Sequence, residues 1–294
     1  MTAVTAEAGW EERGRRRQLA GHEIFALEVP ARAEEWREPL LVLHGFPSSS
    51  FDFHLVLDSL AEHRRVLLVD MVGYGLSSKP DRAYTMDLQA DVVMAYTQEL
   101  GIDRLALLTH DMGDTVGGEL LARQLEGRWP VEITGRLVTN GSIYIQMAHL
   151  SAGQEVLLSL PDERLPDGAA LDRRSIEASL AATFSPESSV PDEELAAMSA
   201  MIARHDGHLL LPRLIRYIEE RRAHESRYTG AIESHPSDLS ILWGADDPIA
   251  LVGMATRLHE ARPDATLEIL DGVGHYPMVE APTRFAQSVA RALG

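Results

Sequence analysis

The sequence predicts an α/β protein built on a mostly parallel, eight-stranded sheet flanked by helices. Short apolar runs alternate with longer segments in which apolar residues recur every three to four positions, and this alternation favours parallel strands covered by helices. A chain of 294 residues with 45% hydrophobic content is long enough for one large core with a smaller appended piece. We therefore expect a single α/β core rather than two unrelated domains.

The first two expected strands, Arg15–Leu19 and Glu23–Val29, are separated by Ala20-Gly21-His22, which favours a hairpin at the sheet edge. Six further apolar runs complete the expected sheet: Leu40–Leu43, Val66–Val69, Leu105–Leu108, Leu137–Thr139, Leu239–Trp243 and Thr266–Leu270. Helical periodicity predicts four helices in the core: Met86–Leu100, Met112–Glu126, Ala250–Ala261 and Pro282–Leu293.

The interval from about Tyr144 to Tyr228 breaks the alternation. It is rich in helix formers and in Pro, Ser, Asp and Glu, and it contains no clear strand. We interpret it as a helical insertion, or cap, that follows the sixth strand. The expected organisation is a mobile tail over residues 1–11, a core formed by residues 12–143 and 231–294, and a cap over residues 144–230.

Composition excludes several classes of function. The formal charge of −18 repels nucleic acid and anionic lipid surfaces, and the chain has no cysteine for disulfides, thiolate metal sites or a thiol nucleophile. The N-terminal segment lacks the apolar core of a signal peptide, and no window approaches the run of about 18 apolar residues that a membrane span needs. We expect a cytoplasmic protein without nucleic-acid or membrane partners, and a homodimer stays open.

Polar clusters follow several of the predicted strands, whose carboxyl ends meet at one rim of a parallel sheet. In the first cluster, His44-Gly45-Phe46-Pro47, Gly45 permits a tight turn and the N–H of Phe46 is placed to stabilise an oxyanion. The second, Asp70–Pro80, contains glycines but lacks the Lys-Ser/Thr pair and the full glycine spacing of nucleotide-binding loops. We interpret it as a structural turn.

The third cluster, Thr109-His110-Asp111-Met112-Gly113, has the small-x-nucleophile-x-Gly form of a nucleophile elbow, with Asp111 at its centre. Small residues at Thr109 and Gly113 relieve crowding around a central residue with a strained backbone. The N–H of Met112 would join that of Phe46 in an oxyanion hole. The alternative is that Asp111 only caps the helix that begins at Met112.

The last cluster has two parts, "ILWGADDPIA" and "LDGVGHYPMVE", which follow the last two predicted strands. They supply Asp246 or Asp247 and then His275. The chain order is therefore nucleophile, acid and histidine, which is the order of hydrolases that carry a nucleophile elbow.

These motifs resemble the α/β-hydrolase superfamily over roughly Gly14 to Leu293, and within it the epoxide hydrolase and haloalkane dehalogenase group, whose elbow carries Asp. The stretches "HDMGDTVGGELL", "TNGSIY", "RHDGHLLLPRLIRYIEERR" and "HYPMVE" are most similar to the mesoderm-specific transcript family, which is regarded as epoxide-hydrolase-like. The resemblance implies that Asp111 is the nucleophile and His275 the general base. Asp247 would orient His275, because the family pattern is Gly-x-x-Asp counted from Gly244.

An ionised carboxylate can attack saturated carbon directly and form an alkyl-enzyme ester, which water activated by His275 then hydrolyses. The resemblance implies that cap tyrosines protonate the opened epoxide and places Tyr217 in this role. Tyr144 is a candidate for a second donor and Tyr228 a weaker one. The expected ligands are a small hydrophobic epoxide and water, with no cofactor and no metal.

We expect His44, Met147 and Phe184 to line an apolar substrate pocket. Three other readings stay open. A haloalkane dehalogenase uses the same elbow, but here Phe46 and Met112 stand where donors to a halide are expected. A slow or non-catalytic sensor of a hydrophobic ligand needs only the pocket, and a cofactor-free oxygenase is a further option.

Overall fold

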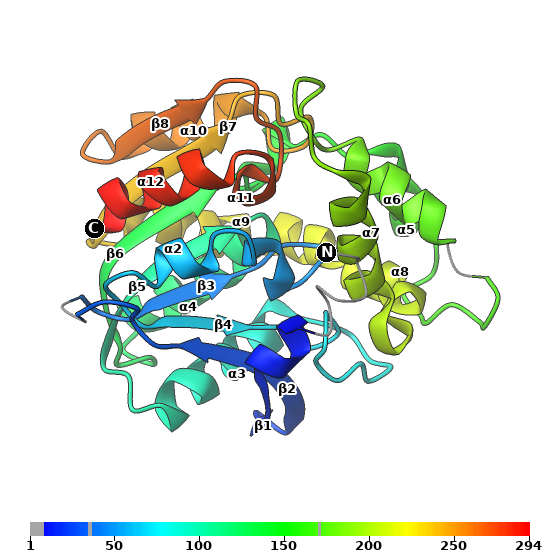
Figure 1. Cartoon of the computed structure of the whole chain (residues 1–294), viewed down its shortest axis with the longest axis horizontal. Coiled ribbons are helices and arrows are strands. Elements are labelled where there is room, and N and C mark those ends of the chain that lie inside the picture. The colour runs from blue at the N-terminus through cyan, green and yellow to red at the C-terminus, as the bar shows by residue number, and fades with distance from the viewer. Residues whose placement is uncertain (1–8, 35–36, 170–171) are drawn as a thin grey trace.

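The computed structural model describes residues 9–34, 37–169 and 172–294 (Figure 1). Its eight-stranded sheet has the order β1-β2-β4-β3-β5-β6-β7-β8. Strands β1 and β2 form an antiparallel hairpin, β2 pairs antiparallel with β4, and all remaining pairs are parallel. The strands are β1 (Arg15–Leu19), β2 (His22–Val29), β3 (Leu40–Leu43), β4 (Val66–Val69), β5 (Arg104–His110), β6 (Glu132–Thr139), β7 (Asp238–Gly244) and β8 (Thr266–Leu270). The predicted fold class is confirmed.

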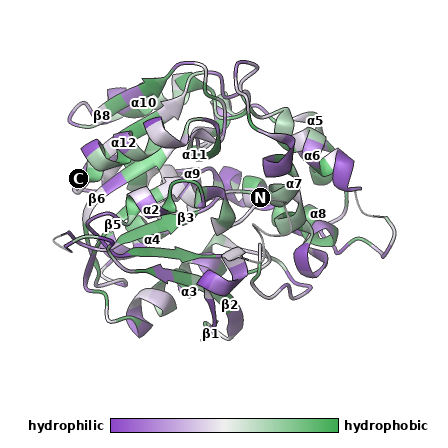
Figure 2. Cartoon of the chain, viewed as in Figure 1, coloured by the Kyte–Doolittle hydropathy of each residue, from purple (hydrophilic) through white to green (hydrophobic). Residues whose placement is uncertain are grey.

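Helices cover both faces of the sheet, which is why the central strands are apolar at every position (Figure 2). Helices α2 (Leu57–Leu60) and α12 (Pro282–Leu293) pack together on one face. On the other face, α4 (Met112–Leu125) packs against α3 (Met86–Glu99) and α9 (Tyr217–Ser234). Helix α10 (Val252–Ala261) packs on β7 and β8, and the short α11 (Pro277–Glu280) precedes α12.

The chain leaves the sheet after β6 and forms a group of helices at one end of it, on the right in Figure 1. This group contains α5 (Ala152–Ser159), α6 (Arg173–Ala181), α7 (Asp192–Ala203) and α8 (Leu211–Leu214). A 3-10 turn at Ile145–Met147 precedes α5, and another at Arg204–Leu210 connects α7 to α8. A third, at Ser50–Phe53, lies in the core before α2. Helix α9 then runs along α4. The last part of the range expected to be cap, residues 217–230, therefore belongs to the helical layer beside the sheet.

The N-terminal tail was expected to be mobile over residues 1–11, of which 1–8 lie outside the described residues. Residues 9–13 are helical, and Trp10 is buried with its ring edge-on to Phe51, the ring centroids 5.7 Å apart. The expectation is wrong for residues 9–11, because burial of the large indole ring holds this segment on the core. Within the described ranges, no helix is both long and apolar enough to span a bilayer.

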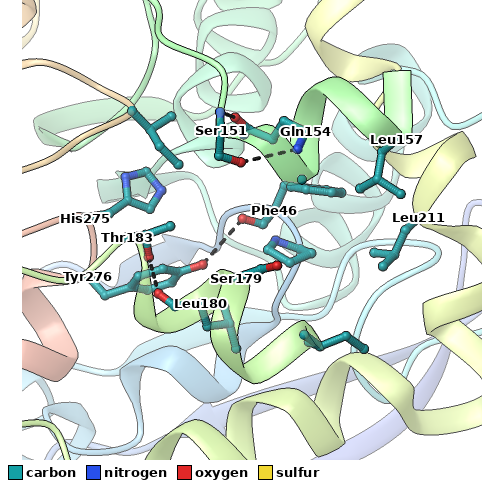
Figure 3. Close-up of a pocket in the computed structure, with 14 residues that line it drawn as sticks. Phe46, Ser151, Gln154, Leu157, Ser179, Leu180, Thr183, Leu211, His275 and Tyr276 are labelled. Atoms are coloured by element: carbon teal, nitrogen blue, oxygen red, sulfur yellow. Dashed lines mark hydrogen bonds between the residues drawn. The ribbon is translucent and has the colours of Figure 1, made fainter. Parts of the chain in front are cut away.

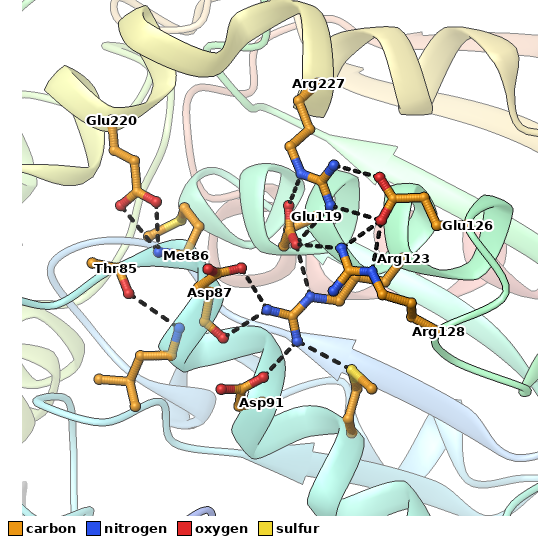
Figure 4. Close-up of polar contacts among 12 residues, drawn as sticks. Thr85, Met86, Asp87, Asp91, Glu119, Arg123, Glu126, Arg128, Glu220 and Arg227 are labelled. Atoms are coloured by element: carbon orange, nitrogen blue, oxygen red, sulfur yellow. Dashed lines mark hydrogen bonds and ion pairs between the residues drawn. The ribbon is translucent and has the colours of Figure 1, made fainter.

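A buried ion-pair network joins α3, α4 and α9 (Figure 4). Glu119 of α4 is 1% exposed and accepts hydrogen bonds from Arg123 Nε at 2.7 Å and from Arg227 Nη2 of α9 at 3.0 Å. Arg123 also pairs with Asp87 and Asp91 of α3. Because Glu119 is shielded from water and contacts two guanidinium groups, its charge is compensated inside the protein rather than by solvent.

Replacing the central carboxylate of this network is expected to destabilise the fold. Glu119→Gln leaves two guanidinium groups without their buried counter-charge and should lower the free energy of unfolding by about 3 kcal/mol. The matched control is Glu126→Gln, which removes a more exposed partner of Arg227 and should lower the free energy of unfolding far less, because solvent screens this pair. Urea unfolding of both variants measures the difference, and equal losses would contradict the assignment.

Candidate active site

Asp111 occupies a sharp turn between β5 and α4. Its φ of 51° lies in the left-handed region, which a residue with a side chain adopts only where the surrounding structure holds it. The neighbouring backbone is too close for side chains: a Cβ on Gly45 would lie 2.7 Å from Asp111 Cβ, and one on Gly113 would lie 2.5 Å from Leu43 O. The elbow predicted from small neighbours thus has a steric basis.

The carboxylate of Asp111 is buried and does not cap α4, although the residue stands at the N-cap position. Oδ2 accepts a hydrogen bond from the N–H of Phe46 at 2.8 Å. Oδ1 lies 4.0 Å from His275 Nε2. One oxygen is therefore held by a backbone donor, while the other faces the imidazole. The alternative of a simple helix cap does not describe this geometry.

His275 is oriented by Asp247, whose Oδ2 lies 2.8 Å from His275 Nδ1. The other oxygen of Asp247 accepts hydrogen bonds from the N–H groups of Ile249 and Ala250 at 2.8 and 3.0 Å. Asp246, the other acid considered, instead accepts a hydrogen bond from Ser185 Oγ at 2.6 Å. The structure thus brings Asp111, His275 and Asp247 into one buried row.

Asn140 belongs to this row and was not among the residues singled out in the sequence. The register of the sheet pairs His110 with Thr139, so the residues that follow, Asp111 and Asn140, emerge side by side. Asn140 Nδ2 donates to Asp247 Oδ2 at 2.8 Å, and its Oδ1 accepts from Gly244 N at 3.1 Å. A polar residue at the end of a parallel strand was the available signal.

The pKa values of two histidines at the site are shifted in opposite directions. Burial opposes protonation of His275, but the negative charges of Asp247 and Asp111 outweigh it and raise its pKa to about 9. Burial, with a smaller effect from His275, lowers the pKa of His110 to about 4. A neutral His110 can donate from Nε2 to the carbonyl of His275, 2.8 Å away, and so hold the loop that carries the imidazole.

A mostly apolar cavity of about 620 Å³, including its mouth, opens between the cap and the sheet (Figure 3). Phe46, His275 and Tyr276 border it from the core. Cap residues supply most of the remaining lining, among them Ser151, Gln154, Leu157, Ile176, Leu180 and Leu211. An apolar chamber beside the buried row suits a small hydrophobic molecule and limits the access of water.

Tyr217, at the start of α9, lies beside the buried row of Asp111, His275 and Asp247. It is 2% exposed, and its ring centroid lies 5.6 Å from that of Phe46. Among the described residues its hydroxyl has no hydrogen-bond partner. Burial, and then the charge of Asp111, raise its pKa above the usual range and so keep the phenol protonated. Tyr276, which the sequence analysis also missed, follows the histidine and borders the cavity.

Other expected site residues lie elsewhere. Tyr144 donates its hydroxyl to Glu233 at 2.7 Å, and Tyr228 donates to Glu220 at 3.0 Å, so neither hydroxyl is free. His44 is fully buried and accepts a hydrogen bond from Met71 N at 3.0 Å, so it links two strand ends and does not line the cavity. The structure therefore does not bring Tyr144 or Tyr228 to the site as a second proton donor, and His44 is not part of the cavity lining.

The remaining expected site residues are Met112, Phe184 and Met147. Met112 follows the elbow, and its sulfur accepts a hydrogen bond from the Tyr74 hydroxyl at 3.0 Å. Phe184 packs edge-on against Tyr276 with ring centroids 5.5 Å apart, whereas Met147 lies near Arg257. Neither Phe184 nor Met147 borders the cavity.

A family model described as alpha/beta hydrolase fold matches residues 38–282. A Mycobacterium tuberculosis (strain H37Rv) protein named "Putative hydrolase LipZ" is 35% identical over 286 residues, which cover 97% of this chain and 96% of that protein. The mesoderm-specific transcript protein of Mus musculus is 32% identical over 260 residues, covering 84% of this chain and 76% of that protein.

Two solved structures share the architecture. An alpha/beta hydrolase fold protein from Burkholderia ambifaria has a TM-score of 0.75 at 22% identity and covers 94% of this chain and 97% of that chain. A loop variant of the haloalkane dehalogenase DbeA from Bradyrhizobium elkanii has a TM-score of 0.72 at 21% identity and covers 95% of both chains. At these identities the likeness concerns the fold.

The charge of Asp111 is expected to be visible in the titration of His275. Asp111→Asn removes a negative charge 4.0 Å from Nε2, which destabilises the imidazolium and should lower the pKa of His275 from about 9 by about one to three. Nitrogen NMR of the labelled imidazole follows the titration. Asp246→Asn, which changes a carboxyl bonded to Ser185, is the control and should leave it unchanged. An unaltered His275 pKa in Asp111→Asn would disprove the coupling.

Proposed function

The chain belongs to the alpha/beta hydrolase fold family, and we propose that this hydrolase opens epoxides through a covalent ester on Asp111. The resemblance to the mesoderm-specific transcript family expected from its motifs is confirmed by the sequence match. The observation that carries the proposal is the carboxylate itself: it stands at the apex of the elbow, with Oδ2 held by Phe46 and Oδ1 facing His275. A serine there would favour acyl substrates.

In the first step, Oδ1 of Asp111 attacks a ring carbon of the epoxide and the carbon–oxygen bond of the ring breaks. The released oxygen takes a proton from Tyr217. The unbonded hydroxyl of Tyr217 and the packing of its ring beside Phe46, whose N–H binds Asp111, support this role. Esterification also removes the negative charge that raises the pKa of Tyr217, so the phenol becomes a better acid as the alkoxide forms.

The second step needs a neutral His275. While Asp111 is ionised, the pKa of about 9 keeps the imidazole protonated at neutral pH. Loss of the Asp111 charge lowers this pKa, and the imidazolium proton passes to the phenolate of Tyr217. His275 then accepts a proton from water, which attacks Cγ of the ester.

The Phe46 N–H already donates to Oδ2, and with Met112 N–H it would stabilise the tetrahedral oxyanion. When this intermediate collapses, the departing diol oxygen takes the proton from His275, and the diol leaves with Asp111 in its protonated form. The carboxyl proton returns to His275, so epoxide and water give the diol without a cofactor.

The same carboxylate would serve a haloalkane dehalogenase, but a departing halide needs donors. Phe46 and Met112, which stand where such donors are expected, have no side-chain donor. The unbonded phenol of Tyr217 instead suits an oxygen leaving group that must gain a proton. These features favour a small hydrophobic epoxide as the substrate of the proposed reaction.

A single turnover in heavy-oxygen water tests the covalent step. With enzyme in excess, water attacks Cγ, so the label should enter Asp111 while the diol receives an unlabelled carboxylate oxygen. Mass spectrometry of the peptide that contains Asp111 detects the label. Asp111→Asn should lose activity by about a thousandfold or more, because an amide is a poor nucleophile. Label that appears first in the diol would contradict the mechanism.

The proton donor is tested by a matched pair of tyrosine variants. Tyr217→Phe should slow the alkylation step by about a hundredfold to ten-thousandfold, because the alkoxide loses its general acid. Tyr144→Phe is the control, since its hydroxyl is bonded to Glu233 and should not affect this step. Single-turnover formation of the ester is followed by rapid quench and mass spectrometry. Equal rates for the two variants would disprove the role of Tyr217.

A further inference from the structure

Arg221, one turn after Tyr217 in α9, is a buried cation with an unused donor. It is 2% exposed. Nε donates to Thr115 Oγ1 at 2.8 Å and Nη1 donates to Ser142 O at 2.7 Å. Nη2 is buried and has no hydrogen-bond partner in the part of the chain that the structure describes. A guanidinium group taken out of water with one donor unpaired is costly unless something else binds there.

Two of the other buried arginines are compensated by the protein, whereas Arg64 also has an unbonded Nη1 but borders a cavity beside Gly294 that no residue of the candidate site lines. Arg123 pairs with Glu119, Asp87 and Asp91. Arg136 has no carboxylate partner, but Nε, Nη1 and Nη2 donate to Ser237, Ile232 and His235, so that each nitrogen has an acceptor. Arg221 has neither kind of compensation: no described carboxylate lies within 4.0 Å of it, and Nη2 is left over.

Asp114 is an acid near Arg221, but it does not neutralise the guanidinium. The two side chains form no ion pair within 4.0 Å. Asp114 is fully buried, and burial raises the pKa of its carboxyl well above the usual range, which favours the uncharged acid. The positive charge of Arg221 therefore remains available to an anion.

Arg221 borders a small cavity next to the substrate cavity. Tyr217, Ser142 and Gln154 line the same space, and Gln154 and Ile249 line both cavities. The guanidinium carbon lies 5.0 Å from the centroid of the Tyr217 ring, so the cation stands directly behind the proposed proton donor. Because Gln154 and Ile249 border both cavities, a molecule in the substrate cavity lies next to the space that Arg221 borders.

We propose that Arg221 binds a carboxylate of the substrate, so that the preferred substrates are small epoxides that carry an acid group. This inference rests on the proposed epoxide hydrolysis. A carboxylate would supply the missing acceptor for Nη2 and the missing counter-charge, and such charge-assisted hydrogen bonds are strong where water is excluded. Repulsion from Asp111 is offset by the protonated His275 beside it.

The first experiment measures binding without chemistry. Isothermal titration compares hexanoate with hexanamide, which has the same shape but no charge. The unmodified protein should bind hexanoate at least about tenfold more tightly. Equal affinities would overturn the inference, and this comparison needs no variant to fold.

Arg221→Gln should abolish the preference for hexanoate, whereas Arg221→Lys, which keeps the charge, should retain part of it. Arg174→Gln is the control, because Arg174 is an exposed cap residue and its loss should not alter the preference. Thermal melting followed by circular dichroism checks that each variant is folded. A folded Arg221→Gln that still prefers hexanoate would overturn the assignment to Arg221.

The second experiment measures turnover of hexanoate and hexanamide that each carry a terminal oxirane. The acid should have the lower KM, and Arg221→Gln should raise the KM of the acid at least about tenfold more than the KM of the amide. Equal KM values for acid and amide would overturn the inference and leave the proposed function intact. No turnover of either epoxide, with the hexanoate preference retained, would overturn the proposed function alone.

Discussion

The left-handed backbone of Asp111 is the constraint on which the rest of the site depends. The turn is held because β5 lies in the middle of the parallel sheet and α4 packs closely behind it, with Gly113 against Leu43 O and Gly45 against the carboxylate. This packing raises the carboxylate above the ends of the strands and brings it to the Phe46 N–H. Strain in one residue is thus offset by the stability of a whole sheet.

A single charge then controls the protonation of its neighbours. With Asp111 ionised, the pKa of His275 is raised to about 9 and that of Tyr217 lies above its usual range, so both groups hold their protons. In the proposed reaction, esterification neutralises Asp111 and lowers both pKa values together. The same event therefore makes Tyr217 an acid and His275 a base, which gives the two steps their order.

The short apolar strands were predictable because their pattern is local. Strands β3, β4 and β8 have the predicted bounds, whereas β6 begins at Glu132 rather than Leu137. The part of β6 before Leu137 is mostly polar and ends at Arg136, whose burial depends on acceptors about 100 residues away. The order of the reactive residues was likewise readable from the sequence. Other features depend on side chains from distant segments, which no local pattern reveals. These are the partner of the Tyr144 hydroxyl, the role of Asn140 and the surroundings of Arg221.

Helix α9 links stability to the geometry of the site. Its first turns carry Tyr217 and Arg221, four residues apart and so on one face. Arg221 is bonded to Thr115 of α4, and Arg227 further along binds Glu119 of the same helix. Helix α4, which follows Asp111, and helix α9, which carries the proposed proton donor, are therefore joined at two points along their length. Since proton transfer requires hydrogen-bond distances, the ion-pair network far from the cavity also fixes the position of the phenol relative to the carboxylate.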